Sequence, residues 1–189
     1  MRVIAGTHRG RRLSGPRGIS LRPTSDKVRE ALFSILATRI PASRFLDLYA
    51  GTGAVGIEAL SRGAAIVTFV ESDSRAVQVM RKNLAACDML AHAEVRVAST
   101  QTFLRQPQSW NGPYDVVFAD PPYADREAVE LVLGSWELGL LAPKAVLVVE
   151  QDARAELPTK TNEARLMRRY DYGDTALFLY EKAPGGSAS

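Results

Sequence analysis

A glycine-rich junction between two apolar segments is the feature that most constrains the fold of this chain. The apolar run at residues 45–48 is followed by Gly51-x-Gly53-x-x-Gly56 and then by the apolar positions of a helix. The order of strand, tight turn and helix is typical of a nucleotide-binding βα junction in an open α/β sheet. Gly51 and Gly53 can adopt positive φ and let a ligand approach the backbone, while Gly56 lets the helix pack closely on the strand.

The residue four positions before the first glycine indicates the class of ligand. Asp47 places a carboxylate near the end of the strand, just ahead of the turn. A dinucleotide would bring an anionic pyrophosphate to this place, where a fixed carboxylate repels it. S-adenosylmethionine carries an ammonium and a sulfonium group and is attracted instead. The pattern Asp-x-x-x-Gly-x-Gly therefore favours a methyl-donor site, with Asp47 accepting from the donor's amino group directly or through water.

A second motif follows another buried strand. The run at residues 114–119 ends in Asp120-Pro121-Pro122-Tyr123, outside the carboxyl end of a strand, where α/β sheets bind ligands. The exocyclic amine of a base is a poor nucleophile because its lone pair is delocalised into the ring. Asp120 and the Pro121 carbonyl could each accept one N–H, the prolines would fix these acceptors in place, and Tyr123 would stack on the base. The motif indicates methylation of a base amine.

Other polar residues stand where a nucleotide-like donor would be bound. Glu71 ends the second strand, 20 residues after Gly51, and is expected to bind the ribose hydroxyls. Ser72 and Asp73 would border the adenine. Ser99, after the third strand, would contact the adenine edge or cap a helix. Backbone N–H groups of residues 51–54 would bind the methionine carboxylate at the start of the helix.

Composition excludes several classes of protein. The 189 residues are 46% hydrophobic and 24% charged, as in an ordinary globular domain, and no apolar run approaches the roughly 20 residues of a membrane span. We expect no signal peptide, no metal and a cytoplasmic protein. Cys87 is the one cysteine, so no disulfide framework is possible, and it is expected to be a small core residue.

The basic charge is concentrated at the start of the chain. Residues 1–30 hold eight basic and two acidic side chains, 8 − 2 = +6, whereas the remaining 16 basic and 19 acidic side chains give 16 − 19 = −3. Seven of the eight are arginines, which suit phosphate oxygens and base stacking. The alternative is a solvated face. We favour nucleic-acid contact, and the candidate residues are Arg9, Arg11, Arg12, Arg17 and Arg22.

Periodicity predicts a basic extension, residues 1–41, and a catalytic domain, residues 42–183, ahead of a disordered tail, residues 184–189. The extension would hold a small hairpin, 2–5 with 11–13, and a helix, 27–37, capped by Thr24, Ser25 or Asp26. The predicted strands are 45–48, 65–70, 94–98, 114–119 and 145–150, and the predicted helices are 54–61, 74–87, 99–105 and 126–138. Runs at 165–172 and 175–181 flank Gly173-Asp174 and predict a hairpin. The whole is a Rossmann-like, doubly wound α/β sheet with an antiparallel C-terminal hairpin.

The chain resembles the class I S-adenosylmethionine-dependent methyltransferases, and more narrowly the RsmD family of bacterial 16S rRNA guanine-N2 methyltransferases. The resemblance covers nearly the whole chain and is carried by the Arg-Val-Ile-Ala-Gly start, the stretches at 22–30 and 46–53, and the motif at 120–123. It implies a mostly parallel seven-stranded sheet and action on 16S rRNA within the assembled small ribosomal subunit. We expect a monomer.

The resemblance also assigns residues. Asp120, Pro121, Pro122 and Tyr123 would serve catalysis. The donor would contact Asp47, Tyr49, Gly51, Thr52, Gly53, Ala54, Glu71, Ser72, Asp73, Ser99 and Asp120. The choice of guanine N2 rests on this resemblance alone. An adenine-N6 or other base-amine RNA or DNA methyltransferase is the first alternative, and a non-catalytic RNA-binding scaffold is the second. An NAD dehydrogenase is the least favoured, because Asp47 opposes a pyrophosphate.

Overall fold

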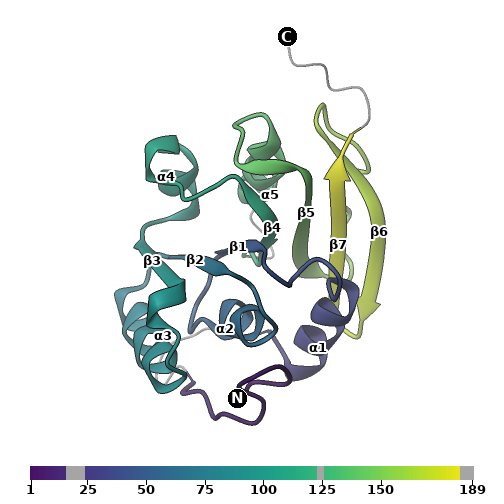
Figure 1. Ribbon diagram of the computed structural model, residues 1–189. Coiled ribbons are helices and arrows are strands. Elements are labelled where there is room, and N and C mark those ends of the chain that lie inside the picture. The colour runs from purple at the N-terminus through teal and green to yellow at the C-terminus, as the bar shows by residue number, and fades with distance from the viewer. Residues whose placement is uncertain (16–23, 123–125, 184–189) are drawn as a thin grey trace.

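The computed structural model describes residues 1–15, 24–122 and 126–183, and in these ranges seven strands form one sheet in the order β3-β2-β1-β4-β5-β7-β6 (Figure 1). The strands are β1 (Arg44–Leu48), β2 (Ile66–Glu71), β3 (Ala93–Val97), β4 (Tyr114–Ala119), β5 (Leu141–Asp152), β6 (Ala164–Tyr172) and β7 (Thr175–Lys182). The helices are α1 (Asp26–Ile35), α2 (Ala54–Ser61), α3 (Ser74–Ala86), α4 (Thr100–Leu104) and α5 (Arg126–Leu133), with short 3₁₀ turns at Leu90–His92, Pro107–Ser109 and Gly134–Trp136.

The direction of the strands follows from their connections. β1 to β5 pair in parallel, and the chain crosses over between them through helices. β6 and β7 are joined by the short Gly173-Asp174 turn, so they pair antiparallel, and β7 also runs antiparallel to β5. The predicted fold class, a mostly parallel doubly wound sheet with an antiparallel hairpin at one edge, is confirmed.

Hydrophobic side chains form a core on each face of the sheet. α1, α2 and α3 pack on one face, and α4 and α5 pack on the other, as the ribbon shows (Figure 1). Both faces are covered, so the central strands are buried on both sides and read as continuous apolar runs. The carboxyl ends of β1 to β5 lie along one edge of the sheet, which positions the candidate site.

Three predicted segments differ from the observed ones by more than one residue at an end. The helix expected at 126–138 is wrong beyond Leu133, where a 3₁₀ turn begins at Gly134. β5 begins at Leu141 instead of 145, because Leu141 pairs with Tyr114 before a register shift in the ladder. α1 begins at Asp26 and ends at Ile35, and Ser25 is its cap, accepting from the N–H of Val28 at 3.2 Å.

The described part of the N-terminal extension forms an irregular hairpin. Arg2 and Arg12 make an antiparallel bridge, and the N–H of Val3 donates to the Arg11 carbonyl at 3.0 Å. Val3 and Leu13 are buried in the same core as α1, α2 and α3. The hairpin passes below these helices in Figure 1, and it is held there by this burial and by hydrogen bonds to Glu58 of α2.

Two kinds of feature are absent from the described ranges. No helix there has the length and apolar composition that crossing a membrane requires. No group of three or more His, Cys, Asp or Glu side chains there is arranged to hold a metal ion.

Candidate active site

The glycine turn and the Asp120 motif leave the sheet side by side. β1 and β4 are parallel neighbours, and their last residues, Leu48 and Ala119, are paired in register. The chain therefore enters the turn from β1 and the motif from β4 at the same level of the sheet. The two motifs that the sequence assigned to donor and acceptor are brought together by this pairing.

Positive φ angles shape the glycine turn. Gly51 has φ 54° and Gly53 has φ 81°, and Gly53 is the N-cap residue of α2. Tyr49, a half-buried residue just before the turn, also has a positive φ, 64°. At Gly56 a β-carbon would lie 2.2 Å from the Phe69 ring, so only glycine lets α2 lie this close to β2. The predicted positive φ of Gly51 and Gly53 and the predicted close packing at Gly56 agree with the geometry, and the approach of a ligand to the turn stays a prediction.

Asp47 lies beneath the turn, inside the protein. Its side chain is 1% exposed, and Oδ2 accepts a hydrogen bond of 2.9 Å from the N–H of Gly56. Burial raises the pKa of Asp47 to about 8. The Gly56 hydrogen bond lowers this pKa by a smaller amount, and the charge of Glu71 adds a still smaller rise. The structure therefore places Asp47 as a support of the turn, and its predicted contact with a donor amino group stays a prediction.

Glu71 connects the glycine turn to the turn after β2. Its Oε2 accepts from the N–H of Gly51 at 2.8 Å, and its Oε1 accepts from the N–H of Asp73 at 2.7 Å. The side chain is 8% exposed, at the end of its strand. Because the Gly51 N–H bonds Glu71 and the Gly53 N–H bonds the Ala50 carbonyl at 2.8 Å, the N–H groups of the turn are partly used within the protein.

Asn83 of α3 joins the glycine turn to the N-terminal extension. Its Nδ2 donates to the carbonyl of Thr52 at 3.0 Å and to that of Ser14 at 3.1 Å, and its Oδ1 accepts from the N–H of Ser14 at 2.8 Å. Asn83 is 2% exposed, and Thr52 is buried beside Ala54. The amide of Asn83 thus holds the turn and the N-terminal extension together.

The remaining residues predicted at the donor site lie on neighbouring strand ends. Asp73 caps α3 by accepting from the N–H of Arg75 at 2.8 Å, and the Arg75 hydrogen bonds lower its pKa. Ser72, between Glu71 and Asp73, is exposed. Ser99 caps α4 through the N–H of Thr102 at 3.1 Å, so the capping alternative is confirmed for this residue.

The acceptor motif begins where β4 ends. Asp120 is half-buried, Pro121 is buried and Pro122 is exposed. The Pro121 carbonyl accepts a hydrogen bond of 3.0 Å from Nε2 of Gln151, which is 2% exposed at the end of β5. Tyr123 lies outside the described residues.

The arginines predicted to bind RNA are only partly described. Arg9, Arg11 and Arg12 are exposed on the hairpin. Arg11 also lies 3.9 Å from the exposed Asp88 carboxylate. Arg17 and Arg22 fall outside the described residues.

Several buried polar residues were missed by the sequence analysis. Each of them forms a hydrogen bond with a residue that is distant in sequence, and together they fix the extension and the strand ends. The missed residues are Glu58, Ser61, Asn83, Glu150 and Gln151. Glu58 is fully buried and accepts from the N–H groups of Ile4 at 2.7 Å and Ala5 at 2.9 Å. Glu58 could have been found from the sequence, because a charged residue within a helix that is otherwise apolar must have a buried partner.

Comparison with known proteins gives matches along the whole chain. The model of the family described as Conserved hypothetical protein 95 matches residues 1–181. Ribosomal RNA small subunit methyltransferase D of Escherichia coli (strain K12) is 38% identical over 188 residues, 100% of this chain and 93% of that protein. The protein of the same name from Haemophilus influenzae is 39% identical over 183 residues, 96% of this chain and 93% of that protein. The solved structure of yhhF from Escherichia coli is 40% identical, with a TM-score of 0.83 over 96% of this chain and 97% of that one.

Proposed function

The chain belongs to the RsmD family, and on that premise we propose that it transfers a methyl group from S-adenosylmethionine to the exocyclic N2 amine of a guanine in 16S rRNA of the small ribosomal subunit. The observation that carries the proposal is the register of Leu48 with Ala119, which sets the glycine turn beside the Asp120 motif. S-adenosylmethionine bound at the glycine turn and a guanine amine bound at the Asp120 motif would therefore be in contact.

The residues around the glycine turn fit S-adenosylmethionine. Glu71 puts a carboxylate close to the turn, which suits a ligand with positive groups and opposes a pyrophosphate, while the buried Asp47 supports the turn through the Gly56 N–H. Glu71 is held at the end of β2, so its carboxylate is fixed where ribose hydroxyls would lie. With the Gly51 and Gly53 N–H groups used internally, Thr52 and Ala54 are the N–H groups we assign to the methionine carboxylate.

The acceptor amine would be held by Asp120 and the Pro121 carbonyl. S-adenosylmethionine, when bound, supplies an electrophilic methyl carbon on a sulfonium. By accepting one N–H each, Asp120 and Pro121 favour a pyramidal amine whose lone pair faces that carbon. The N–C bond forms as the C–S bond breaks, and the positively charged nitrogen then loses a proton to Asp120 or to water. Most of the acceleration would come from alignment.

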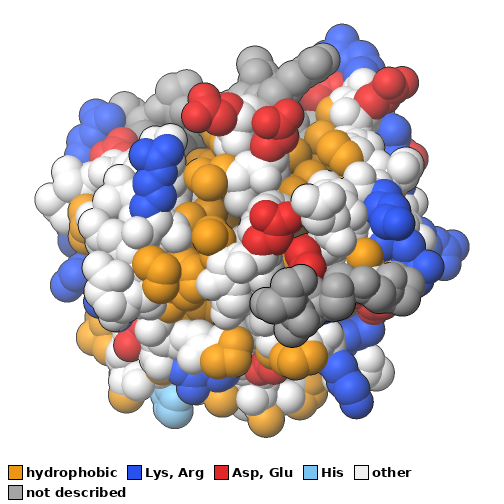
Figure 2. Space-filling model, turned by 90° about the horizontal axis from the view of Figure 1, so that it is seen from above, with side chains coloured by type: hydrophobic (Ala, Val, Ile, Leu, Met, Phe, Trp, Pro, Cys, Tyr) orange, Lys and Arg blue, Asp and Glu red, His pale blue; other side chains and the backbone are white. Residues whose placement is uncertain are grey.

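The N-terminal hairpin is the surface we assign to rRNA phosphates. Arg9, Arg11 and Arg12 are exposed there, and the hairpin lies below α1, α2 and α3 (Figure 1). On the opposite side of the molecule, Figure 2 shows hydrophobic and acidic side chains near the centre and most Lys and Arg toward the rim.

Methyl transfer from labelled S-adenosylmethionine tests the proposal. The acceptors are small ribosomal subunits that lack guanine-N2 methylation, free 16S rRNA and duplex DNA, with Asp120→Ala as the control variant. We expect transfer to subunits, loss of at least about 100-fold in the variant, and little transfer to DNA. Transfer to DNA alone would favour the DNA alternative, and tight donor binding without transfer to any acceptor would favour the scaffold.

A further inference from the structure

We propose that Gln151 is a positioning residue that holds the Pro121 carbonyl oxygen in the orientation required by the acceptor amine. Gln151 is the last residue but one of β5, is 2% exposed, and donates from Nε2 to this oxygen at 3.0 Å. The inference rests on the proposed function, since the orientation of this carbonyl affects the rate only if an amine reacts beside it.

The sheet brings the two residues to the same level. β4 and β5 are parallel, and Ala119 is paired with Val149. Pro121 and Gln151 each come two residues after that pair, so the strands deliver them side by side. Side chains alternate along a strand, so Gln151 points to the same face as Val149, the face covered by α4 and α5. The contact therefore follows from the register of the two strands, with Pro121 only two residues beyond the last pair.

The Pro121–Pro122 peptide group can be hydrogen-bonded to the rest of the protein only through its oxygen. Proline nitrogen carries no hydrogen in a peptide, so this peptide group has no N–H to bond to a neighbouring strand. The ring fixes φ of Pro121, and the following proline limits ψ of Pro121 to the extended region, within which ψ decides where the carbonyl oxygen points. A hydrogen bond to that oxygen is the one polar contact that can fix the peptide plane. The oxygen has two lone pairs, so one remains for the acceptor amine.

The end of β5 is itself held firmly. Glu150, the neighbour of Gln151, is 3% exposed, and its Oε2 accepts from Oγ1 of Thr24 at 3.0 Å. Consecutive residues of a strand point to opposite faces, so Glu150 is held on the α1 face and Gln151 bonds Pro121 on the α5 face. Gln151 also lies opposite Ala176 of β7 in register. The support on which Gln151 stands is therefore rigid, as positioning requires.

Steady-state kinetics of Gln151→Met test the inference. Methionine keeps the length of the side chain but cannot donate, so the carbonyl loses its anchor. We expect kcat to fall about 10- to 100-fold, with the KM for small subunits and the Kd for S-adenosylmethionine unchanged within about twofold, since neither ligand loses a contact. Gln78→Met, the same change at an exposed position of α3, is the matched control and should leave kcat unchanged.

Gln151→Glu adds a signature that a general loss of packing would not give. A protonated carboxyl can donate to the Pro121 oxygen, whereas a carboxylate cannot and repels it. The kcat of Gln151→Glu relative to the wild type should therefore rise as pH falls, while the ratio for Gln151→Met stays constant. This variant also carries the test if the Met variant does not fold.

The outcomes separate the two claims. If the wild type is active and Gln151→Met has the same kcat, the role of Gln151 is overturned and the proposed function is left intact. A wild type that transfers no methyl group to any acceptor would overturn both. A fall in kcat equal to that of Gln78→Met would assign the effect to general loss of stability and overturn the inference.

Discussion

The carboxylate of Asp47 accepts a hydrogen bond of 2.9 Å from the backbone N–H of Gly56 in the interior of the protein. The contact spans the glycine turn, from the strand before it to the helix after it. The turn is thereby fixed from inside the sheet, and the carboxylate that fixes it is withdrawn from water.

Burial of Asp47 makes stability dependent on pH. The pKa of Asp47 is raised from 3.8 to about 8, so between these values the folded protein keeps a proton that the unfolded chain loses. The free energy of unfolding therefore falls as pH rises through this range, by up to about 1.4 kcal/mol per pH unit for this group. Asp47→Asn keeps an acceptor for Gly56 and cannot ionise, so urea denaturation from pH 5 to 8 should show a smaller slope. Identical slopes for the two proteins would contradict this assignment.

Gly56→Ala should destabilise the protein. A β-carbon there would lie 2.2 Å from Cε1 of Phe69 and 2.8 Å from a methyl carbon of Val67, so α2 must move away from β2. We expect a loss of about 1–3 kcal/mol in the free energy of unfolding, the usual range for overpacking. Gly134→Ala is the matched control, since a β-carbon at Gly134 meets nothing within 4 Å. Equal denaturation midpoints for the two variants would rule out the close packing of α2 on β2 as the reason for Gly56.

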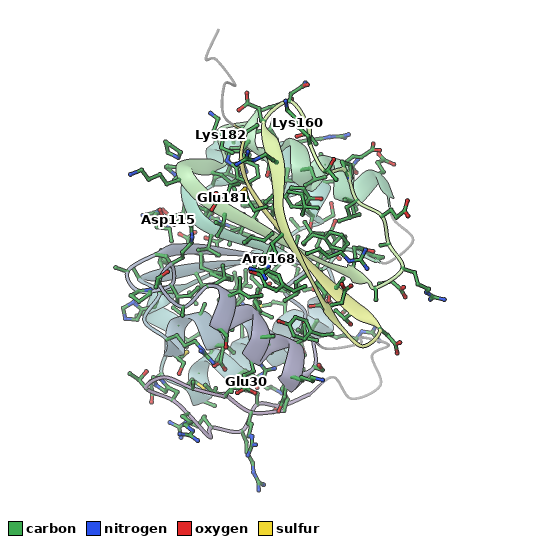
Figure 3. The ribbon with its side chains drawn as sticks, turned by 90° about the vertical axis from the view of Figure 1, so that its right-hand side faces the viewer. Glu30, Asp115, Lys160, Arg168, Glu181 and Lys182 are labelled. Carbon is green, nitrogen blue, oxygen red and sulfur yellow. The ribbon has the colours of Figure 1, made fainter. Side chains whose placement is uncertain are left out.

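Glu58→Gln should loosen the N-terminal hairpin. Both oxygens of the fully buried carboxylate accept backbone N–H groups, those of Ile4 and Ala5, and an amide offers only one oxygen. Loss of one buried acceptor costs about 1–3 kcal/mol, so hydrogen exchange of these two amides should become roughly 10- to 100-fold faster. Glu30→Gln, at an exposed position of α1 (Figure 3), is the control. Unchanged exchange in Glu58→Gln would show that the Glu58 carboxylate does not hold the hairpin.

Arg11→Ala with Arg12→Ala should weaken rRNA binding and leave donor affinity unchanged. Each phosphate contact that is lost lowers the slope of log K against log salt by about 0.7–0.9. Removing both arginines should therefore reduce the slope by about 1.4–1.8, as measured by filter binding at several salt concentrations. The matched control, Lys160→Ala with Arg168→Ala, removes the same charge from the β6 side (Figure 3). An equal loss from both double variants would indicate a general charge effect and no contact at the hairpin.

The order of elements could be predicted because local patterns determine it. β4 runs from Tyr114 to Ala119 as the apolar run predicts, and α2 runs from Ala54 to Ser61 between the glycine turn and Arg62. The early start of β5 could not be predicted, since it depends on pairing of Leu141 with Tyr114 on another strand. Periodicity describes one segment at a time and carries no information on such pairing.

The site was predicted less completely, for the same physical reason. The glycine turn and the Asp120 motif are local sequences, and the sheet places them together. Asn83 and Gln151 act on partners that are 31 and 30 residues away in the chain, and a lone buried amide gives no pattern. Asp47 was predicted to accept from the donor's amino group, which stays a prediction, and its hydrogen bond to the Gly56 N–H under the turn was not foreseen. Local motifs indicate which chemistry is present, and the packed fold shows what holds it in place.

Analysis of the methylated nucleoside tests the central claim most directly. Small subunits lacking guanine-N2 methylation would be incubated with the protein and labelled S-adenosylmethionine, and the rRNA would be digested and separated with standards. The proposed function requires labelled N2-methylguanosine that is absent with Asp120→Ala. Labelled N6-methyladenosine in its place would contradict the guanine assignment while keeping the amine chemistry, and no labelled nucleoside at all would contradict the proposed reaction.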